Sequence, residues 1–235
     1  MVRKHVWASA GAALLLMVAA ASSEAQTVTL DEGTFRLLMG GREVGTETFS
    51  IRQNGSGQDA VIIASGRVVL AGQQGSQELL SSLRVAGGTL RPAAYDLTVE
   101  GAEEQKIAGR VMGGRFSARI VSSAGENMRE YLVSDGAVVA EDGVAHHNYF
   151  LARQAEAGAT RIPIVVPRQN RQVFAAVSVG AAESVEAGGQ RVSARRLTIR
   201  PEGGDARSVW IDDQGRVLRV EIPASGYVAV RAALP

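Results

Sequence analysis

The stretch YDLTVE, residues 95–100, decides the fold class, because apolar and polar side chains alternate along it. Tyr95, Leu97 and Val99 would share one face of an extended chain, and the residues between them would share the other. Successive side chains of a β-strand point to opposite faces, so this alternation predicts a strand with one buried and one solvated face. The same period recurs in residues 34–39, 49–52, 115–120, 196–200 and 218–222. Half-buried strands are typical of antiparallel sheets, and we therefore predict an all-β fold.

Glycine-rich turns separate the predicted strands. Glycine pairs stand at residues 40–41, 87–88, 113–114, 188–189 and 203–204. Glycine supplies the positive φ that two-residue hairpin turns require. No Walker-type G-x-x-x-x-G-K motif is present, and no G-x-G-x-x-G stands between a strand and a helix, so these glycines indicate turns. The expected architecture is an antiparallel meander curled into a half-open barrel or a two-layer sandwich, because curling removes exposed sheet edges.

One segment departs from the strand pattern. Residues 144–157, VAHHNYFLARQAEA, have a helical composition and a narrow apolar stripe at helical spacing. Asp142 is the expected N-cap and Gly158 the expected stop. We expect one short helix that lies across a sheet face or plugs an end of the barrel. The prolines at 163 and 167 bound a short extended run suited to a sheet edge, and residues 26–235 are expected to form a single β-rich domain.

The first residues indicate export. A basic start over residues 3–5 precedes an apolar run over residues 8–21, and small residues around Ala25 suit cleavage there. This pattern is typical of a secretory signal peptide over residues 1–25. The apolar run is shorter than the roughly 20 residues that span a bilayer. We therefore expect a periplasmic or secreted protein with no transmembrane anchor after cleavage.

Charge and cysteine content exclude several partners and chemistries. The predicted signal peptide holds two of the 25 basic and one of the 24 acidic residues, which leaves 23 of each. A chain without excess positive charge does not suit nucleic acid as its main partner. The sequence has no cysteine, which excludes thiol chemistry, thiolate metal sites and a lipidated N-terminal cysteine. No cofactor is expected.

His146 and His147 are the only histidines after the predicted cleavage site, so a Ser-His-Asp site, or a metal site of one histidine and carboxylates, would have to use one of them. Adjacent side chains on a helix diverge by about 100°, and the zinc-protease motif H-E-x-x-H is absent. We therefore expect His147 to pack beside Phe150 and Leu151, and His146 to face solvent. The hydrolase motif G-x-S-x-G is also absent. A hydrolase that uses His146 or His147 is the second alternative to a non-catalytic protein.

Several predicted strands are apolar on both faces, and this feature points to a function. Residues 61–64, 68–70 and 164–166 carry apolar side chains at successive positions. Such a sheet must cover its second face with a helix, a second layer or a ligand. The leading hypothesis is a non-catalytic protein that binds an apolar ligand, or a lipid-linked envelope component, in the concavity of the sheet. The first alternative is a protein–protein interaction or assembly module of the cell envelope.

Three aromatic residues are candidates for contact with an apolar ligand: Trp210, Tyr95 and Phe150. Trp210 takes the strand face opposite Val209 and Ile211. Either that strand is buried on both sides, or the indole lines a concavity on the second face. Burial is favoured, because large aromatic side chains contribute most to protein cores.

Three segments resemble a known family. They are the opening hairpin over residues 35–51, the segment GTLRP at residues 88–92 followed by Tyr95, and the closing run over residues 183–220. On these segments the chain resembles an uncharacterised family of exported bacterial envelope proteins, a domain of unknown function. The resemblance implies a strongly curved antiparallel half-barrel, similar to periplasmic carriers of lipoproteins and lipids, and no assigned chemistry. It does not extend to residues 144–157.

Overall fold

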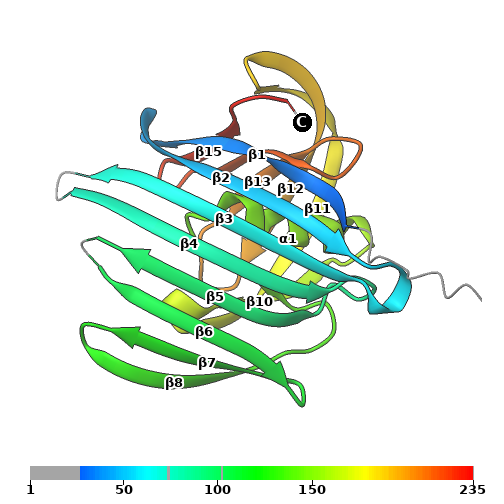
Figure 1. Cartoon of the computed structure of the whole chain (residues 1–235). Helices are drawn as coiled ribbons and strands as arrows, with labels where there is room; N and C mark the ends of the chain where they lie inside the picture. The colour runs from blue at the N-terminus through cyan, green and yellow to red at the C-terminus, as the bar shows by residue number, and fades with distance from the viewer. Residues whose placement is uncertain (1–26, 73–74, 102, 235) are drawn as a thin grey trace, which may run out of the picture.

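The computed structural model describes residues 27–72, 75–101 and 103–234 (Figure 1). The predicted signal peptide, residues 1–25, lies outside the described residues. Within the part of the chain that the structure describes, no helix has the length and hydropathy needed to cross a lipid bilayer.

The fold is all-β with one short α-helix, as predicted. The strands are β1 Thr27–Met39, β2 Arg42–Asn54, β3 Val61–Gly72, β4 Gly75–Ala86, β5 Pro92–Glu100, β6 Gln105–Met112, β7 Arg115–Ser122, β8 Gly125–Leu132, β9 Val138–Val139, β10 Arg161–Val166, β11 Arg171–Ala187, β12 Gln190–Pro201, β13 Arg207–Ile211, β14 Val217–Ile222 and β15 Tyr227–Arg231. The helical elements are α1 Asn148–Glu156 and the 3₁₀ turns η1 Gly57–Asp59, η2 Ala145–His147 and η3 Pro167–Gln169.

All fifteen strands belong to one sheet, whose two ends, β8 and β9, do not pair among the described residues. The strand order is β8-β7-β6-β5-β4-β3-β2-β1-β15-β14-β13-β12-β11-β10-β9. Every neighbouring pair is antiparallel except the pair of β9 with β10. The sheet therefore consists of two meanders, β1–β8 and β9–β15, joined where β1 pairs with β15. It curls around α1 (Figure 1), which matches the predicted half-open barrel rather than a two-layer sandwich.

Two-glycine turns join several of the hairpins. Gly40 and Gly41 join β1 to β2 with φ of +56° and +80°, and Gly113 and Gly114 join β6 to β7 with φ of +56° and +81°. Positive φ at both central residues defines the type I′ turn, whose twist matches that of the flanking strands. The prediction that glycine pairs mark hairpin turns is confirmed at these two positions.

The helix predicted over residues 144–157 forms as two pieces, η2 and α1, and Gly158 follows with φ of +93°. Asp142 is not the N-cap, contrary to the prediction, because η2 begins without any side-chain cap. The Asp142 carboxylate instead accepts hydrogen bonds from Arg207 at 2.8 Å and from Gln169 at 2.7 Å. These distant donors hold the carboxylate away from the start of the helical segment.

The helical segment fills the concave side of the sheet. η2 packs against β3, and α1 packs against β11, β13 and β14. Phe150 and Leu151 of α1 are 1% and 0% exposed, and they join the inner faces of both meanders in one core. The prediction of a helix across a sheet face is confirmed. The chain itself therefore covers the inner face of the sheet.

A second, smaller core lies on the opposite face of β13. Trp210 packs there with Val185, Ala187, Ala194 and Leu218. The hairpin of β11 and β12 arches over this part of the sheet and supplies three of these residues (Figure 1). All five residues of β13 are buried. The strand is buried on both sides, which is the arrangement favoured from the sequence.

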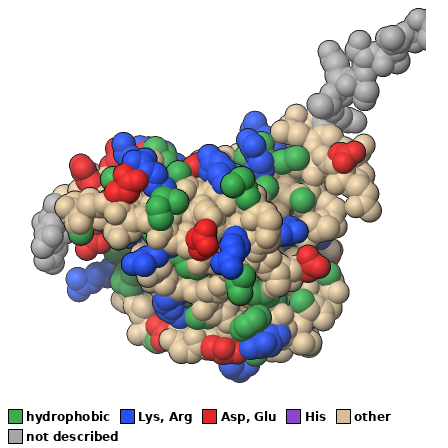
Figure 2. Space-filling view, turned by 90° about the horizontal axis from the view of Figure 1, so that it is seen from below, with side chains coloured by type: hydrophobic (Ala, Val, Ile, Leu, Met, Phe, Trp, Pro, Cys, Tyr) green, Lys and Arg blue, Asp and Glu red, His purple; other side chains and the backbone are tan. Residues whose placement is uncertain are grey.

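The solvated face of the first meander carries cross-strand ion pairs. Arg67 on β3 lies 2.6 Å from Glu78 on β4, and Arg119 on β7 lies 2.6 Å from Glu126 on β8. On the face seen in Figure 2, basic and acidic side chains are interspersed. The surface in this view therefore lacks the concentrated positive charge that a nucleic-acid surface needs.

A side chain of β11 bonds the end of β8 across the opening of the curled sheet. Gln172, near the start of β11, accepts the backbone N–H of Leu132 at 3.1 Å and donates to the carbonyl of the same residue. Beside it, the Tyr131 hydroxyl donates to Asn170 at 3.1 Å. The last residues of β8 are therefore held to the start of β11 much as a partner strand would hold them.

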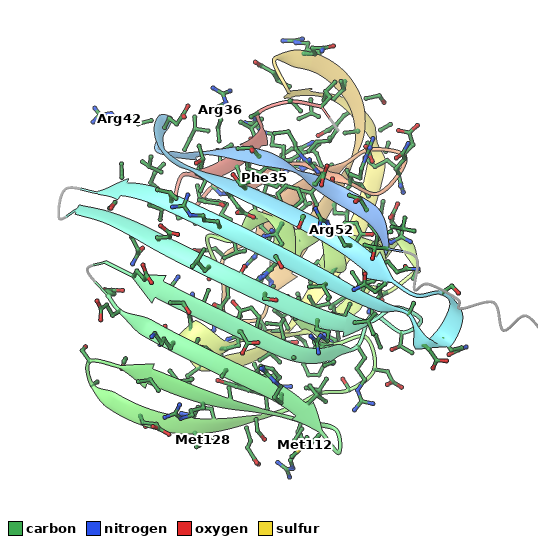
Figure 3. All side chains as sticks on the ribbon, viewed as in Figure 1. Phe35, Arg36, Arg42, Arg52, Met112 and Met128 are labelled. Carbon is green, nitrogen blue, oxygen red and sulfur yellow. The ribbon has the colours of Figure 1, made fainter. Side chains whose placement is uncertain are left out.

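A buried ion pair lies at the seam between the two meanders. Arg231 on β15 is 1% exposed, and its Nη2 donates to both carboxylate oxygens of Asp31 on β1, at 2.6 and 2.5 Å. The guanidinium also lies 5.1 and 4.8 Å from the ring centres of Phe35 and Phe49. Gly33 leaves room for it, since a Cβ there would lie 2.5 Å from Arg231 Nη1. Phe35 is among the side chains labelled in Figure 3.

We expect Arg231→Met to lower the free energy of unfolding by about 3–5 kcal/mol, because it leaves the Asp31 carboxylate buried without a partner. Urea unfolding followed by circular dichroism measures the change. Arg119→Met is the matched control: its ion pair with Glu126 is about half exposed, so its loss should change the free energy of unfolding far less. Equal effects of the two substitutions would contradict a structural role for the buried pair.

Candidate functional site

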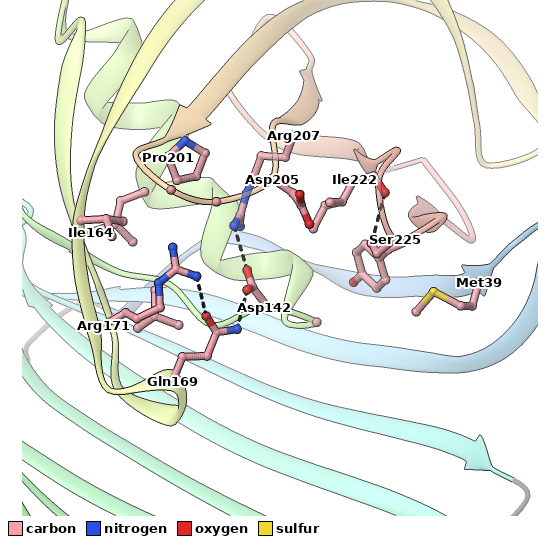
Figure 4. A pocket seen from close by; sticks show the side chains of 16 residues that line it. Met39, Asp142, Ile164, Gln169, Arg171, Pro201, Asp205, Arg207, Ile222 and Ser225 are labelled. Atoms are coloured by element: carbon pink, nitrogen blue, oxygen red, sulfur yellow. Dashed lines mark hydrogen bonds and ion pairs between the residues drawn. The ribbon is translucent and has the colours of Figure 1, made fainter.

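A pocket opens at one end of the curled sheet, where η3, the β12–β13 loop and the β14–β15 turn meet (Figure 4). Its volume is about 450 Å³, which lies within the range of small-molecule sites. We call it the mouth pocket. The side chains that line it are Met39, Asp142, Ile164, Val166, Gln169, Arg171, Val173, Pro201, Asp205, Arg207, Ile222, Ser225 and Tyr227.

One wall of the mouth pocket is apolar. Ile164 and Val173 pair across β10 and β11, so their side chains share a face, and Val166 stands two residues further along β10 on the same face. Ile222 adds to the apolar lining from β14. Ile164, Val166 and Ile222 are all less than a tenth exposed. The wall is therefore an edge of the main core that borders the pocket.

Two arginines supply positive charge to the mouth pocket. Arg207 on β13 is 8% exposed and donates to Asp142 at 2.8 Å, while Gln169 donates to the other Asp142 oxygen at 2.7 Å. Arg171 donates to Gln169 at 3.0 Å (Figure 4). Among the described residues Arg171 forms no ion pair with a carboxylate. The charge of Arg207 is therefore compensated, and the charge of Arg171 is not.

Two buried donors at the mouth pocket lack a hydrogen-bond partner among the described residues. They are the hydroxyl of Tyr227, a residue 7% exposed, and Nε of Arg207. Buried polar groups are nearly always paired, so these two donors are exceptions, and neither atom has exposed surface. Burial, with a contribution from Glu47, raises the pKa of Tyr227 well above its usual value. The hydroxyl therefore stays protonated and can donate.

A buried carboxylate anchors the helical segment to the sheet. Glu47 on β2 is fully buried and accepts hydrogen bonds from Ala145 N at 2.6 Å, His146 N at 2.8 Å and His146 Nδ1 at 2.6 Å. The imidazole fits against Gly66, where a Cβ would lie 2.3 Å from the ring. The expectation that His146 faces solvent is wrong, because the sheet presents a buried acceptor to it and Gly66 makes space.

His147 is fully buried, and its surroundings keep it neutral. The backbone N–H of Glu141 donates to His147 Nδ1 at 3.2 Å, and the ring meets Tyr95 at a centre-to-centre distance of 5.7 Å. Burial, with a contribution from the neighbouring His146, lowers the pKa of His147 well below its usual value. Glu141 is 2% exposed, and burial raises its pKa to about 7 although it accepts the N–H of Arg168 at 3.0 Å.

The geometry around His146 does not provide the parts of a hydrolase. Ser81 lies opposite Gly66 in the β3–β4 register and so shares the inner face with the imidazole. A serine nucleophile needs a hydrogen bond to its base, yet Ser81 Oγ and His146 Nε2 both lack a partner. Neither residue lines the mouth pocket or three further pockets of the described residues. In the same part of the chain, no group of three or more histidine, aspartate and glutamate side chains is placed to hold a metal ion.

The structure does not bring the three aromatic residues predicted to contact a ligand together. Tyr95 and Phe150 are 0% and 1% exposed in the main core. Trp210 lies in the outer core, where its indole donates to Glu183 at 2.5 Å and the Arg196 guanidinium lies 5.3 Å from its ring. None of the three lines the mouth pocket. Their role in ligand binding stays a prediction.

Sequence reasoning missed the polar residues of the site, although the strand period contained a signal for two of them. Arg207 has the same parity as Val209 and Ile211, which the alternation assigns to the core. Glu47 likewise has the parity of Phe49 on β2. A charged residue at a core position of a strand indicates a buried polar contact. No comparable signal marks the other residues of the pocket.

No protein-family model and no curated protein matches the sequence. A solved structure is similar in fold: the crystal structure of a beta-barrel-like protein of domain of unknown function DUF1849 from Brucella abortus. The match covers 87% of this chain and 96% of that chain, with a TM-score of 0.55 and 12% sequence identity. At this identity the likeness shows the fold, an uncharacterised β-barrel-like domain, as the resemblance implied. Membership of an envelope family stays a prediction.

Glu141 and His147 contribute to stability with opposite pH dependence. The pKa of Glu141 rises on folding from 4.5 to about 7, so its contribution is present below pH 4.5 and is lost as the pH rises to about 7. The pKa of His147 falls on folding from 6.5, so its contribution is present above pH 6.5 and is lost as the pH falls. Between pH 4.5 and pH 6.5, the ordinary pKa values of Glu141 and His147, the two contributions to the free energy of unfolding therefore change with pH in opposite directions.

We expect Glu141→Gln to remove one of the two slopes. Relative to the unsubstituted protein, its free energy of unfolding falls by about 1.4 kcal/mol for each pH unit from about pH 6.5 to about pH 5. His147→Gln gives a slope of similar size and opposite sign. Urea unfolding at a series of pH values measures both slopes. If the free energy of unfolding of Glu141→Gln has the same pH dependence as that of the unsubstituted protein, the pKa of the Glu141 carboxyl is not raised.

Proposed function

We propose that the protein is an exported, non-catalytic binding protein that holds an apolar or amphipathic ligand in the mouth pocket. The observation that carries the proposal is the lining of this pocket, where a buried apolar wall and the guanidinium of Arg171, whose one side-chain hydrogen bond among the described residues is to Gln169, border the same cavity. Mostly apolar walls with a few polar groups are typical of small-molecule sites. A lipid-linked component of the cell envelope has the matching chemistry, with an acyl chain for the wall and a polar head for the guanidinium.

The proposed binding place differs from the concavity predicted from the sequence. The concave side of the sheet holds η2 and α1, which pack against strands of both meanders. Residues 164–166, apolar on both faces, are all buried in the structure. Of these, Ile164 and Val166 line the mouth pocket. The open volume for an apolar ligand therefore lies at the end of the curled sheet.

Val173→Trp tests the proposal by filling the mouth pocket from its wall. Val173 lies on β11, where an aromatic side chain suits the strand. We expect the unsubstituted protein, purified from the cell envelope, to carry about one apolar molecule per chain, as specific pockets of this size do, and Val173→Trp to carry none. Native mass spectrometry followed by lipid extraction gives the stoichiometry.

Phe174→Trp is the matched control for this experiment. Phe174 follows Val173 on β11, points to the other face and is 37% exposed. It should keep the ligand. A ligand-free unsubstituted protein, or full retention of the ligand by Val173→Trp, would refute binding in the mouth pocket.

A second candidate function, an assembly module of the cell envelope, is favoured by the outer edge of β8, which pairs with no strand among the described residues, although Gln172 bonds its last residue, Leu132. β8 is the last strand at one end of the sheet, and Met128 on it is 61% exposed. Met112 and Leu132 flank Arg115 in register and are 77% and 63% exposed. Met112 and Met128 are labelled in Figure 3. An edge strand with exposed apolar side chains is a template for pairing with another chain.

Crosslinking in cells separates this candidate from ligand binding. If β8 binds a partner protein, a photoreactive amino acid at Met128 should give one discrete protein adduct. The same group at Val28 should give none, because Val28 is 44% exposed but lies on β1, in the middle of the sheet order. Equal adducts at both positions, or none at either, would speak against the assembly module.

A further inference from the structure

The mouth pocket contains one uncompensated positive charge. Both oxygens of Asp142 are occupied, one by Arg207 and the other by Gln169. Arg171 is half-buried, and its only hydrogen bond among the described residues is the one to Gln169. The remaining carboxylate of the lining, Asp205, is exposed on the β12–β13 loop. A ligand that enters the pocket therefore meets the Arg171 guanidinium as a free charge.

Arg171 is held in place before any ligand arrives. Its Nη1 donates to Gln169 Oε1 at 3.0 Å, and Gln169 is itself fixed by its bond to Asp142. On the other side, a Cβ at Gly204 would lie 3.0 Å from Arg171 Nη2, so the guanidinium lies close to this residue, which has no side chain. A guanidinium has five N–H donors, and most of those of Arg171 remain free. Such preorganisation reduces the entropy cost of binding.

The two buried polar groups at the mouth pocket that lack a partner among the described residues are donors as well, whereas Asp205 is an exposed carboxylate. The Tyr227 hydroxyl and Arg207 Nε are buried and unpartnered. A cationic head group would find both Asp142 oxygens already engaged and would face the charge of Arg171. An anionic head group would find the free N–H groups of Arg171. The apolar wall formed by Ile164, Val166 and Ile222 borders the same cavity.

We propose that the mouth pocket recognises a monoanionic amphiphile, a carboxylate carried on an acyl chain, and that Arg171 selects the carboxylate. This inference rests on the proposed function, because it names the class of ligand for the same pocket. The single free positive charge of Arg171 matches a head group with one negative charge. A dianionic phosphate head group would bring a second negative charge, and the lining has no further free cation among its described residues to pair with it. The planar guanidinium suits a carboxylate, since it can donate two parallel hydrogen bonds.

Isothermal titration calorimetry of the purified protein, with amphiphiles below their micelle concentration, tests the proposal. The probes are dodecanoate, dodecanol, dodecyl phosphate and dodecyltrimethylammonium, which share a chain and differ in the head group. We expect dodecanoate to bind at least about tenfold more tightly than each of the others, because a charge-assisted pair adds over 1 kcal/mol. Arg171→Met should lower the affinity for dodecanoate to about that of dodecanol and leave dodecanol binding unchanged.

Arg191→Met is the matched control, since Arg191 is an exposed arginine on β12 outside the mouth pocket. It should leave every affinity unchanged. Equal affinities for dodecanoate and dodecanol, or an Arg171→Met protein that still prefers dodecanoate, would overturn the head-group inference and leave the proposed function standing. A preference for the phosphate or the ammonium probe would overturn it as well. Binding of none of the four probes would overturn both the inference and the proposed function.

Discussion

One buried carboxylate couples the helical segment to the sheet, and the shape of the molecule depends on it. Glu47 accepts the N–H groups of Ala145 and His146, which open η2 and have no partner within the helical segment. A buried carboxylate without donors costs several kcal/mol, and so do buried N–H groups without acceptors. The Glu47 carboxylate and the N–H groups of Ala145 and His146 therefore supply each other's hydrogen-bond partners. Strands of both meanders pack against the segment that Glu47 holds, so this contact fixes the segment inside the curl of the sheet.

The same anchor positions the mouth pocket. Asp142 lies three residues before η2, so the contact that places η2 also places this carboxylate at the end of the sheet. Asp142 then orders Arg207 and Gln169, and Gln169 in turn orients Arg171. The polar side of the pocket is thus a chain of hydrogen bonds that begins in the core. Its apolar side is the core itself, which borders the cavity through Ile164 and its neighbours.

The strands and hairpins could be predicted because they depend on neighbouring residues. Alternation over six residues is enough to identify β5, and two glycines identify the turn between β1 and β2. The site could not be predicted, because its contacts join distant parts of the chain. The bond between His146 and Glu47 spans 99 residues, and the bond that removes Asp142 from its expected N-cap spans 65. Periodicity shows that a polar residue faces inward, but it does not identify its partner.

The pairing of β1 with β15 has a consequence for the order in which the molecule assembles. Strands far apart along the chain are neighbours at the centre of the sheet, and Asp31 and Arg231 are 200 residues apart. Most other strand pairs join consecutive strands and can form early. The pairing of β1 with β15 requires the closure of a very long loop, which costs more conformational entropy. Until residues 227–231 pair with β1, one edge of β1 presents unpaired backbone N–H and C=O groups. A chain that has not yet formed this pair is therefore most exposed to mispairing at β1, which becomes a central strand of the sheet.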